Sequence, residues 1–309
     1  MDLDDINTVA VLGAGNMGHG IAEVAALAGY DVHLRDINEE FVQDGYDQIE
    51  WSLGKLAEND RIGKTSLRRP SSASRPFVDM EEACGDVDVV IEAVPEQMAI
   101  KQDVYEELES VAPDHTIFAT NTSSLSITDL AEFTERPEQF LRDALFQPPV
   151  RMDLVEVISG AESADETLDV IEELADDFGK SPVRVHKDEP GFIVNRVLVP
   201  LMNEATWLVH EDHATIEEVD STTKYGMGLP MGSFELADMT GIDIGYHVLE
   251  YMHDVLGDTY EPSPLFEQKV ENENLGTKTG KGFYDTRTAR EQRSRPTKFP
   301  RSSRPVSSR

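Results

Sequence analysis

The chain has 309 residues, and 60 acidic side chains against 27 lysines and arginines give it a formal net charge of −33 at pH 7. This charge excludes nucleic acid and anionic membrane surfaces as partners, because both repel a strongly acidic protein. The length predicts two domains, each large enough to bury its own core. The acids are spread along most of the chain. We interpret them as a general adaptation of the surface to high cytoplasmic salt, which screens self-repulsion; an acidic binding surface is the alternative.

The rest of the composition favours a soluble, cytoplasmic protein. A single cysteine, Cys84, excludes an internal disulfide and fits a reducing cytosol. We expect it to be a small buried side chain. The chain does not open with a positively charged segment followed by an apolar one, and it contains no apolar run of about 18 residues. We therefore predict no membrane partner, and we predict no metal site.

Short apolar strands alternate with helix-period segments through the first half of the chain. This alternation predicts an α/β fold with a Rossmann-like, doubly wound parallel sheet. After Pro190 the pattern changes to long apolar-periodic helices, which predict an all-helical second domain. The expected strands cover 8–12, 31–35, 86–93 and 115–120, and the expected helices cover 18–28, 39–56, 99–111, 192–208 and 245–255. The predicted domains are 1–187 and 188–285, followed by a tail at 286–309.

Two basic segments differ from the acidic chain around them. Residues 61–76 hold five lysines and arginines and no acid, and residues 286–309 hold seven arginines and Lys298 against Glu291 alone. Serine, arginine and proline dominate both, and neither has helical or strand periodicity. One interpretation is an ordinary basic loop and a disordered tail. The other is out-of-frame translation of a GC-rich gene, which yields these three residue types.

A glycine-rich turn follows the first predicted strand and opens the first predicted helix. Gly13 permits the tight turn, Gly15 lets the backbone approach a pyrophosphate, and Gly18 allows close packing of helix and strand. The free N–H groups of the helix N-terminus then face the phosphates. Asp36 ends the second strand, where its carboxylate can accept hydrogen bonds from both ribose hydroxyls and repels a 2′-phosphate, so NAD is preferred over NADP. The predicted cofactor-binding loop comprises Gly13, Ala14, Gly15, Asn16, Met17 and Gly18.

Arg35, which precedes Asp36, does not change this preference. On a strand its side chain points to the opposite face, away from a ribose bound at Asp36.

Five motifs in the same order resemble the 3-hydroxyacyl-CoA dehydrogenase family. The resemblance implies an N-terminal Rossmann-like domain and a helical C-terminal domain that forms a homodimer. It also implies a reaction in which hydride moves from C3 of a 3-hydroxyacyl-CoA substrate to NAD, as in fatty acid β-oxidation. The motifs are the glycine loop with Ile21-Ala22, then 90–96 (VIEAVPE), 121–125 (NTSSL), 190–196 (PGFIVNR) and 278–284 (KTGKGFY).

The resemblance also implies roles for single residues. Ser123 and Asn195 match the polar groups that hold the substrate oxygen, and both can donate to an oxygen that gains negative charge. Glu156 matches the acid that orients a catalytic histidine, since a carboxylate behind an imidazole fixes its tautomer. The residues implied near the cofactor are Glu96, Lys101, Lys278 and Gln147, the last in place of an asparagine, and Ser52 falls where the family contacts CoA.

Four of these positions also have a purely structural interpretation. Ser123 could cap a helix over 125–133, and Asn195 could be an exposed helix residue. Glu156 lies in an apolar run, where a buried carboxylate needs a partner such as a lysine or arginine. Ser52 could be a lone serine on an amphipathic helix.

The chain departs from the family at the catalytic base. Where the resemblance implies histidine, with the family's spacing from Ser123 and Glu156, this sequence has Ala144. Alanine cannot accept a proton, so we predict a severe defect in activity with cofactor binding retained. The altered patch is confined to 142–147. One hypothesis is a local pair of compensating frame errors, which agrees with the two basic segments; the other is a pseudoenzyme that retains NAD and acyl-CoA binding.

Overall fold

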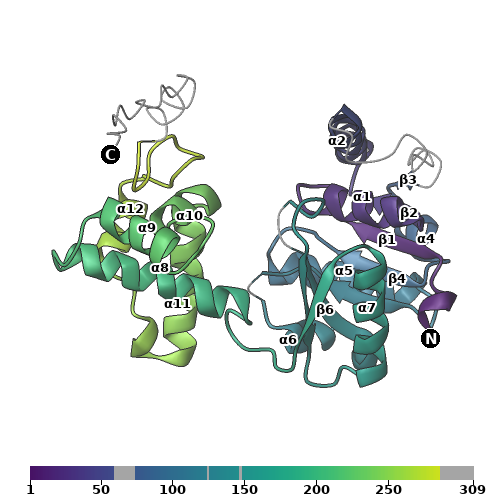
Figure 1. The fold of residues 1–309 in the computed structure, drawn as a ribbon. Helices are drawn as coiled ribbons and strands as arrows, with labels where there is room; N and C mark the ends of the chain where they lie inside the picture. Colours follow the sequence, from purple (N-terminus) through teal and green to yellow (C-terminus); the bar gives the residue numbers. More distant parts are fainter. Residues whose placement is uncertain (59–73, 124, 146–147, 286–309) are drawn as a thin grey trace, which may run out of the picture. The chain divides into compact units, whose positions relative to one another are not determined.

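The computed structural model describes residues 1–58, 74–123, 125–145 and 148–285. The chain forms two compact units, Met1–Ile193 and Val194–Arg309 (Figure 1). The division falls a few residues beyond the predicted boundary at 187. Each unit has its own core, as the length of the chain led us to expect.

The first unit is built on one sheet, which within the described residues has eight strands in the order β3-β2-β1-β4-β5-β6-β7-β8. The strands from β3 to β6 are parallel, whereas β7 runs antiparallel to β6 and β8 runs parallel to β7. The Rossmann-like prediction is confirmed, and the antiparallel β6–β7 pair extends it. The strands are β1 Thr8–Leu12, β2 Asp31–Arg35, β3 Ser74–Phe77, β4 Val89–Glu92, β5 Ile117–Thr120, β6 Phe140–Leu145, β7 Leu154–Ser159 and β8 Ser181–Val185.

Helices cover both faces of this sheet (Figure 1). Val9 and Val11 of β1 pack into one core with α1, α2 and α7, while Ala10 and Leu12 pack into the other with α4, α5 and α6. Alternate side chains of a strand point to opposite faces, which explains how one short apolar run feeds two cores. The helices are α1 Gly18–Ala28, α2 Glu39–Glu58, α4 Met80–Cys84, α5 Met98–Val111, α6 Ile127–Ala131 and α7 Asp165–Asp177, with short 3₁₀ turns η1 Leu3–Asp5 and η2 Pro137–Gln139.

The second unit is helical, as predicted. Its terminal loop is tied to α10, because Asp238 accepts hydrogen bonds from the N–H groups of Phe283 (2.8 Å) and Tyr284 (2.9 Å). The Tyr284 hydroxyl donates to Asp220 at 2.8 Å. The elements of this second unit are α8 Val194–His210, α9 Ile216–Ser221, the π-helical turn η3 Thr222–Gly226, α10 Ser233–Thr240, α11 Ile242–Leu256, the 3₁₀ turn η4 Asp258–Tyr260 and α12 Pro264–Glu271.

Several smaller predictions meet the structure here. Cys84 is fully buried, as expected, and burial raises the pKa of its thiol to about 12. The first basic segment was expected to contain no strand, which is wrong at its end: β3 includes Pro76, a residue that sheets tolerate at their edges. The rest of that segment, 61–73, and the tail at 286–309 lie outside the described residues. Among the helices that are described, none is both long and apolar enough to cross a membrane.

Candidate functional site

The glycine loop between β1 and α1 has one open position and two closed ones. Gly13 has φ +99°, and a Cβ there would lie 2.6 Å from the Ala93 carbonyl oxygen. A Cβ on Gly18 would lie 1.6 Å from the Gly13 carbonyl oxygen, so both glycines are required for packing. Around a Cβ on Gly15, in contrast, no described atom lies within 4 Å. Gly15 therefore leaves its backbone open at the N-terminus of α1, which is the space that a dinucleotide pyrophosphate needs.

Asp36 lies beside this loop at the end of β2. Its Oδ2 accepts a hydrogen bond from the Ala14 N–H (2.7 Å), and its Oδ1 accepts one from the Ile37 N–H (2.7 Å). Each carboxylate oxygen keeps acceptor capacity for a ribose hydroxyl. The Arg35 side chain turns away and donates from Nε to the Val78 carbonyl oxygen (3.0 Å), as the strand alternation predicts. The residues that are present fit NAD.

Helix α2 closes against the glycine loop. A Cβ on Gly45 would lie 2.9 Å from the Ala14 Cβ, so this helix glycine sets how closely α2 approaches the cofactor loop. No motif in the sequence indicated Gly45. Ser52, on the same helix, is half-buried and hydrogen-bonds to the buried Glu23 carboxyl, whose pKa desolvation raises to about 7. Ser52 is thus engaged within the fold, and its contact with CoA stays a prediction.

Glu96 and Ser123 meet at the carboxyl ends of β4 and β5. Glu96 Oε1 accepts from the Thr122 hydroxyl (2.6 Å), the Ser123 N–H (2.7 Å) and the Ser123 hydroxyl (3.2 Å). The structural interpretation of Ser123 as a helix cap is wrong, because Ser126 is the N-cap of α6. Ser123 is exposed, so its hydroxyl can exchange Glu96 for a substrate oxygen.

Lys101 is buried below this pair rather than at its surface. Its ammonium lies 2.6 Å from Glu92 Oε1 and 3.6 Å from Glu96 Oε2, and the residue has no exposed surface. Tyr105 and Thr120 donate to the other oxygen of Glu92, at 3.1 and 2.8 Å. The Lys101 ammonium therefore attracts the Glu96 oxygen that does not accept from Ser123. The motifs gave no role to Glu92 or Tyr105, although a glutamate inside the apolar run 89–93 signals a buried carboxylate that needs partners.

The β6–β7 ladder pairs Ala144 with Glu156. Side chains at paired antiparallel positions share a face of the sheet, with Cβ atoms about 4.5–5.5 Å apart. A side chain at position 144 is therefore expected on the same face of the sheet as Glu156; the role of Glu156 in orienting a base stays a prediction. Glu156 is 3% exposed, and its Oε1 accepts from the Ile193 N–H at 3.0 Å. The side chain of Ala144 and the whole of Gln147 lie outside the described residues.

Two neighbouring ionic residues on β6 are buried without full hydrogen bonding. Arg142 is 5% exposed with its Cζ 4.0 Å from the centre of the Phe192 ring, and its Nε and Nη1 have no partner among the described residues. Burial lowers the Arg142 pKa to about 10, against the opposing attraction of Glu156. Asp143 is 2% exposed, its Oδ1 also has no described partner, and desolvation raises its pKa to about 7. Each such buried atom costs on the order of 1–3 kcal/mol.

Two predicted site residues belong to the helical unit. Asn195 is half-buried in the first turn of α8, so it is not the exposed helix residue of the structural interpretation. Lys278 lies in the terminal loop, where its ammonium is 2.5 Å from Asp243 Oδ1. Their roles toward substrate and cofactor stay predictions.

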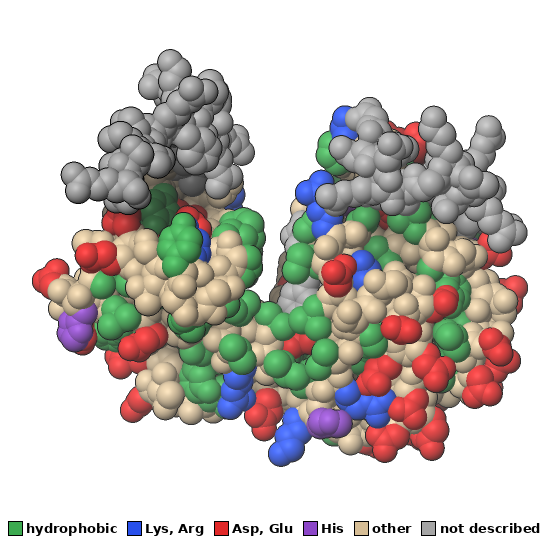
Figure 2. Space-filling view, viewed as in Figure 1, with side chains coloured by type: hydrophobic (Ala, Val, Ile, Leu, Met, Phe, Trp, Pro, Cys, Tyr) green, Lys and Arg blue, Asp and Glu red, His purple; other side chains and the backbone are tan. Residues whose placement is uncertain are grey.

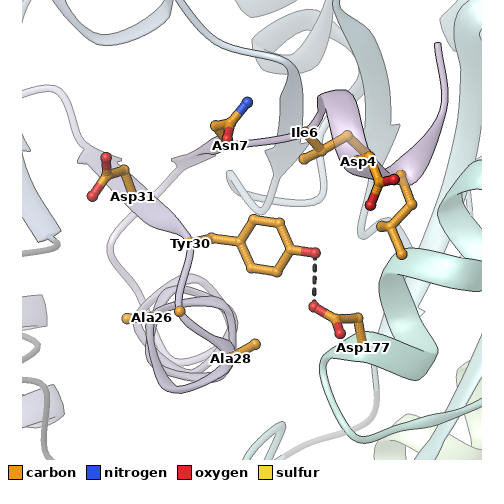
Figure 3. A pocket seen from close by; sticks show the side chains of 10 residues that line it. Asp4, Ile6, Asn7, Ala26, Ala28, Tyr30, Asp31 and Asp177 are labelled. Carbon is orange, nitrogen blue, oxygen red and sulfur yellow. Dashed lines mark hydrogen bonds between the residues drawn. The ribbon is translucent and has the colours of Figure 1, made fainter.

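A separate hollow lies at the amino ends of β1 and β2, where the Tyr30 hydroxyl donates to Asp177 at 2.8 Å (Figure 3). Asp4 and Asp31 also line it, which makes it acidic. Ligands of parallel α/β sheets bind at the carboxyl ends of the strands. This hollow is therefore at the wrong end of the sheet to be the cofactor site.

Comparison with known proteins agrees with this geometry. Residues 8–189 match the family described as 3-hydroxyacyl-CoA dehydrogenase, NAD binding domain, and residues 191–286 match its C-terminal domain. The chain belongs to the 3-hydroxyacyl-CoA dehydrogenase family. The family resemblance read from the five motifs is confirmed, and so are the NAD cofactor and the NAD-dependent oxidoreductase class.

Relatives of this dehydrogenase family align over nearly the whole chain. A probable 3-hydroxybutyryl-CoA dehydrogenase of Bacillus subtilis is 40% identical over 282 residues, covering 91% of this chain and 98% of its own. The mitochondrial hydroxyacyl-coenzyme A dehydrogenase of Sus scrofa is 38% identical over 286 residues, covering 90% and 91%. The crystal structure of (S)-3-hydroxybutyryl-CoA dehydrogenase from Ralstonia eutropha superposes with a TM-score of 0.87 at 36% identity, covering 91% of this chain and 99% of that one.

Proposed function

We propose that this chain binds NAD at the Gly13–Gly18 loop and oxidises the 3-hydroxyl of an acyl-CoA, at a rate limited by the missing base at position 144. The observation that carries the proposal is the ladder pairing of Ala144 with Glu156, on a sheet that also carries the Glu96–Ser123 pair. The carboxylate that orients a base is thus present, opposite a residue that cannot take a proton. NAD supplies the hydride acceptor when bound.

In this proposal the protein's residues hold the substrate and stabilise the charge that forms on its C3 oxygen. Ser123 donates its hydroxyl hydrogen to the C3 oxygen, and Asn195 donates from its amide, so charge that develops on that oxygen is stabilised. Glu96 orients Ser123 and lies near the cofactor, as do Gln147 and Lys278, while Ser52 contacts CoA. The C3 hydrogen leaves with its electron pair, and the hydroxyl proton passes to solvent because position 144 cannot accept it.

Two origins of the altered patch remain in this proposal, and we favour the first. Arg142 and Asp143 leave three buried polar atoms unpaired among the described residues, which is the misfit expected from a segment translated in the wrong frame. The other origin is a pseudoenzyme that keeps NAD and acyl-CoA binding without turnover. The intact mass of the protein from its native cell distinguishes them: agreement with this sequence contradicts the frame-error origin.

We further infer a cytoplasmic homodimer from a salt-adapted cell, acting in β-oxidation or short-chain acyl-CoA metabolism. Acidic side chains are spread over the visible face of both units, which supports adaptation of the whole surface (Figure 2). The helical unit exposes large apolar side chains on α8 and α11, which supports association through that unit. These are Val197 (63% exposed), Ile244 (55%) and Val255 (56%).

The unaltered protein is expected to reduce NAD slowly with 3-hydroxybutyryl-CoA, and to prefer NAD over NADP by about tenfold or more. A 2′-phosphate beside the Asp36 carboxylate costs at least about 1.4 kcal/mol, which corresponds to that factor. The measurement is the initial rate of absorbance increase at equal concentrations of the two cofactors, with Asp36→Asn as the control in which the preference falls. Equal rates with both cofactors would contradict the assigned role of Asp36. Binding of acyl-CoA with no turnover in any variant would favour the pseudoenzyme.

A further inference from the structure

We propose that Glu92 is a positioning residue that clamps together the two loops carrying Glu96 and Ser123. The inference rests on the proposed function of those two residues and adds the group that holds them. Glu92 ends β4 with no exposed surface, and donors approach both of its carboxylate oxygens. Oε1 accepts from the Lys101 ammonium (2.6 Å) and the Val94 N–H (2.7 Å), and Oε2 accepts from Tyr105 (3.1 Å) and Thr120 (2.8 Å).

These contacts tie down both loops at once. The Val94 N–H starts the loop that leads to Glu96, so its bond to Glu92 fixes that loop at its root. On the neighbouring strand, Thr120 donates to Glu92 while its own hydroxyl oxygen accepts from the Thr122 N–H at 3.2 Å. The loop that carries Ser123 is therefore anchored to the same carboxylate.

Charge gives the clamp its second function. Lys101 is a buried cation shared unequally between two carboxylates, at 2.6 Å from Glu92 and 3.6 Å from Glu96. Because Glu92 holds the ammonium at the shorter distance, Glu96 is left to accept from the Ser123 N–H and hydroxyl. Without the Glu92 charge, the buried ammonium needs Glu96 as its partner, since an unpaired buried charge is strongly unfavourable. Glu96 is then drawn toward Lys101 and away from Ser123.

Glu92→Gln tests this, with Tyr105→Phe as the matched control. Glutamine keeps the size of the side chain but removes its charge and turns one acceptor oxygen into a donor facing other donors. Phenylalanine at position 105 removes one hydrogen bond to the same carboxylate and leaves the charge intact. We expect Glu92→Gln to weaken NADH binding about tenfold and to shift the emission maximum of bound NADH, because Glu96 moves. We expect Tyr105→Phe to leave both unchanged while lowering the melting temperature.

Unchanged NADH affinity and emission in folded Glu92→Gln overturn the proposal. The proposal is also overturned if both variants lose NADH affinity in proportion to their loss of melting temperature, because that result indicates a purely structural role. If Glu92→Gln does not fold, Thr120→Val takes its place. Unlike Tyr105, Thr120 ties the Ser123 loop to Glu92, and that loop carries the Thr122 and Ser123 donors that hold Glu96. Thr120→Val is therefore expected to let Glu96 move and to weaken NADH binding in the same direction. If the unaltered protein does not bind NADH, the proposed function itself is contradicted. If the unaltered protein and Thr120→Val bind NADH with the same affinity, only the clamp is contradicted.

Discussion

Replacing Ala144 with histidine is expected to raise the turnover of 3-hydroxybutyryl-CoA by about 10²–10⁴, the usual contribution of a general base. The ladder pairs this position with Glu156, so an imidazole there has a carboxylate on the same face to fix its tautomer and stabilise the imidazolium. The measurement is kcat at saturating NAD and substrate for the two proteins.

Ala144→Gln is the control, because glutamine is polar and comparable in size but cannot accept a proton at neutral pH. The gain with histidine must also depend on pH. Only neutral imidazole is a base, so kcat rises with pH through the imidazole pKa and then levels off, whereas the glutamine variant lacks this step. Arg142 nearby lowers that pKa and Glu156 raises it. Equal rates for the alanine, glutamine and histidine proteins would refute our account of the base.

Replacing Asp143 with leucine is expected to raise the free energy of unfolding at pH 8 by about 4 kcal/mol. The Asp143 side chain faces the apolar core of α1, α2 and α7: it pairs with Val157 across the ladder, and its strand neighbours Leu141 and Leu145 belong to that core. Burial raises its pKa from 3.8 to about 7. A shift of about three pKa units corresponds to about 4 kcal/mol of penalty on the ionised form. Urea unfolding followed across pH measures the gain.

The sign of the pH dependence follows from this raised pKa. Below about pH 4 Asp143 is protonated in both states and imposes no ionisation penalty. Between pH 4 and pH 7 the unfolded chain loses the proton that the folded chain keeps, so stability falls as pH rises, and above pH 7 the loss is complete. Asp143→Asn removes this slope but leaves a buried polar group. It is therefore expected to gain only the pH-dependent part of the free energy of unfolding that the leucine variant gains. A leucine variant no more stable than the unaltered protein at pH 8 would contradict the misfit.

The sequence predicted best the three elements around the glycine turn. β1, α1 and β2 have the predicted limits, because a fully apolar strand followed by a glycine turn has few alternatives. β6 was missed, since Arg142 and Asp143 interrupt its apolar pattern. β8 was missed because it contains Pro182 and is only partly buried. These strands are formed by tertiary pairing, which local patterns do not encode.

The sequence predicted those site residues whose chemical role can be read from a local motif. The glycine loop, Asp36 and Ser123 were found from motifs, and the structure brings Ser123 to Glu96 as a hydrogen-bonded pair. Glu92 and Tyr105 were not found, because their function depends on which strand ends lie side by side. Lys101 was found from the family resemblance, and the structure adds the contact of its ammonium with Glu92; its place near the cofactor stays a prediction. Contacts between loops are set by the sheet order, which sequence spacing alone does not give.

Calorimetric titration of NADH into the unaltered protein in molar KCl, beside its Gly15→Ala variant, tests the central claim most directly. The open space at Gly15 predicts that the unaltered protein binds one NADH per chain. The variant is expected to fold, because its new Cβ meets no described atom, and to bind NADH more weakly, because that Cβ occupies the space of the pyrophosphate. Absence of binding heat from the folded unaltered protein, or equal affinity in both proteins, would contradict a dinucleotide site at this loop.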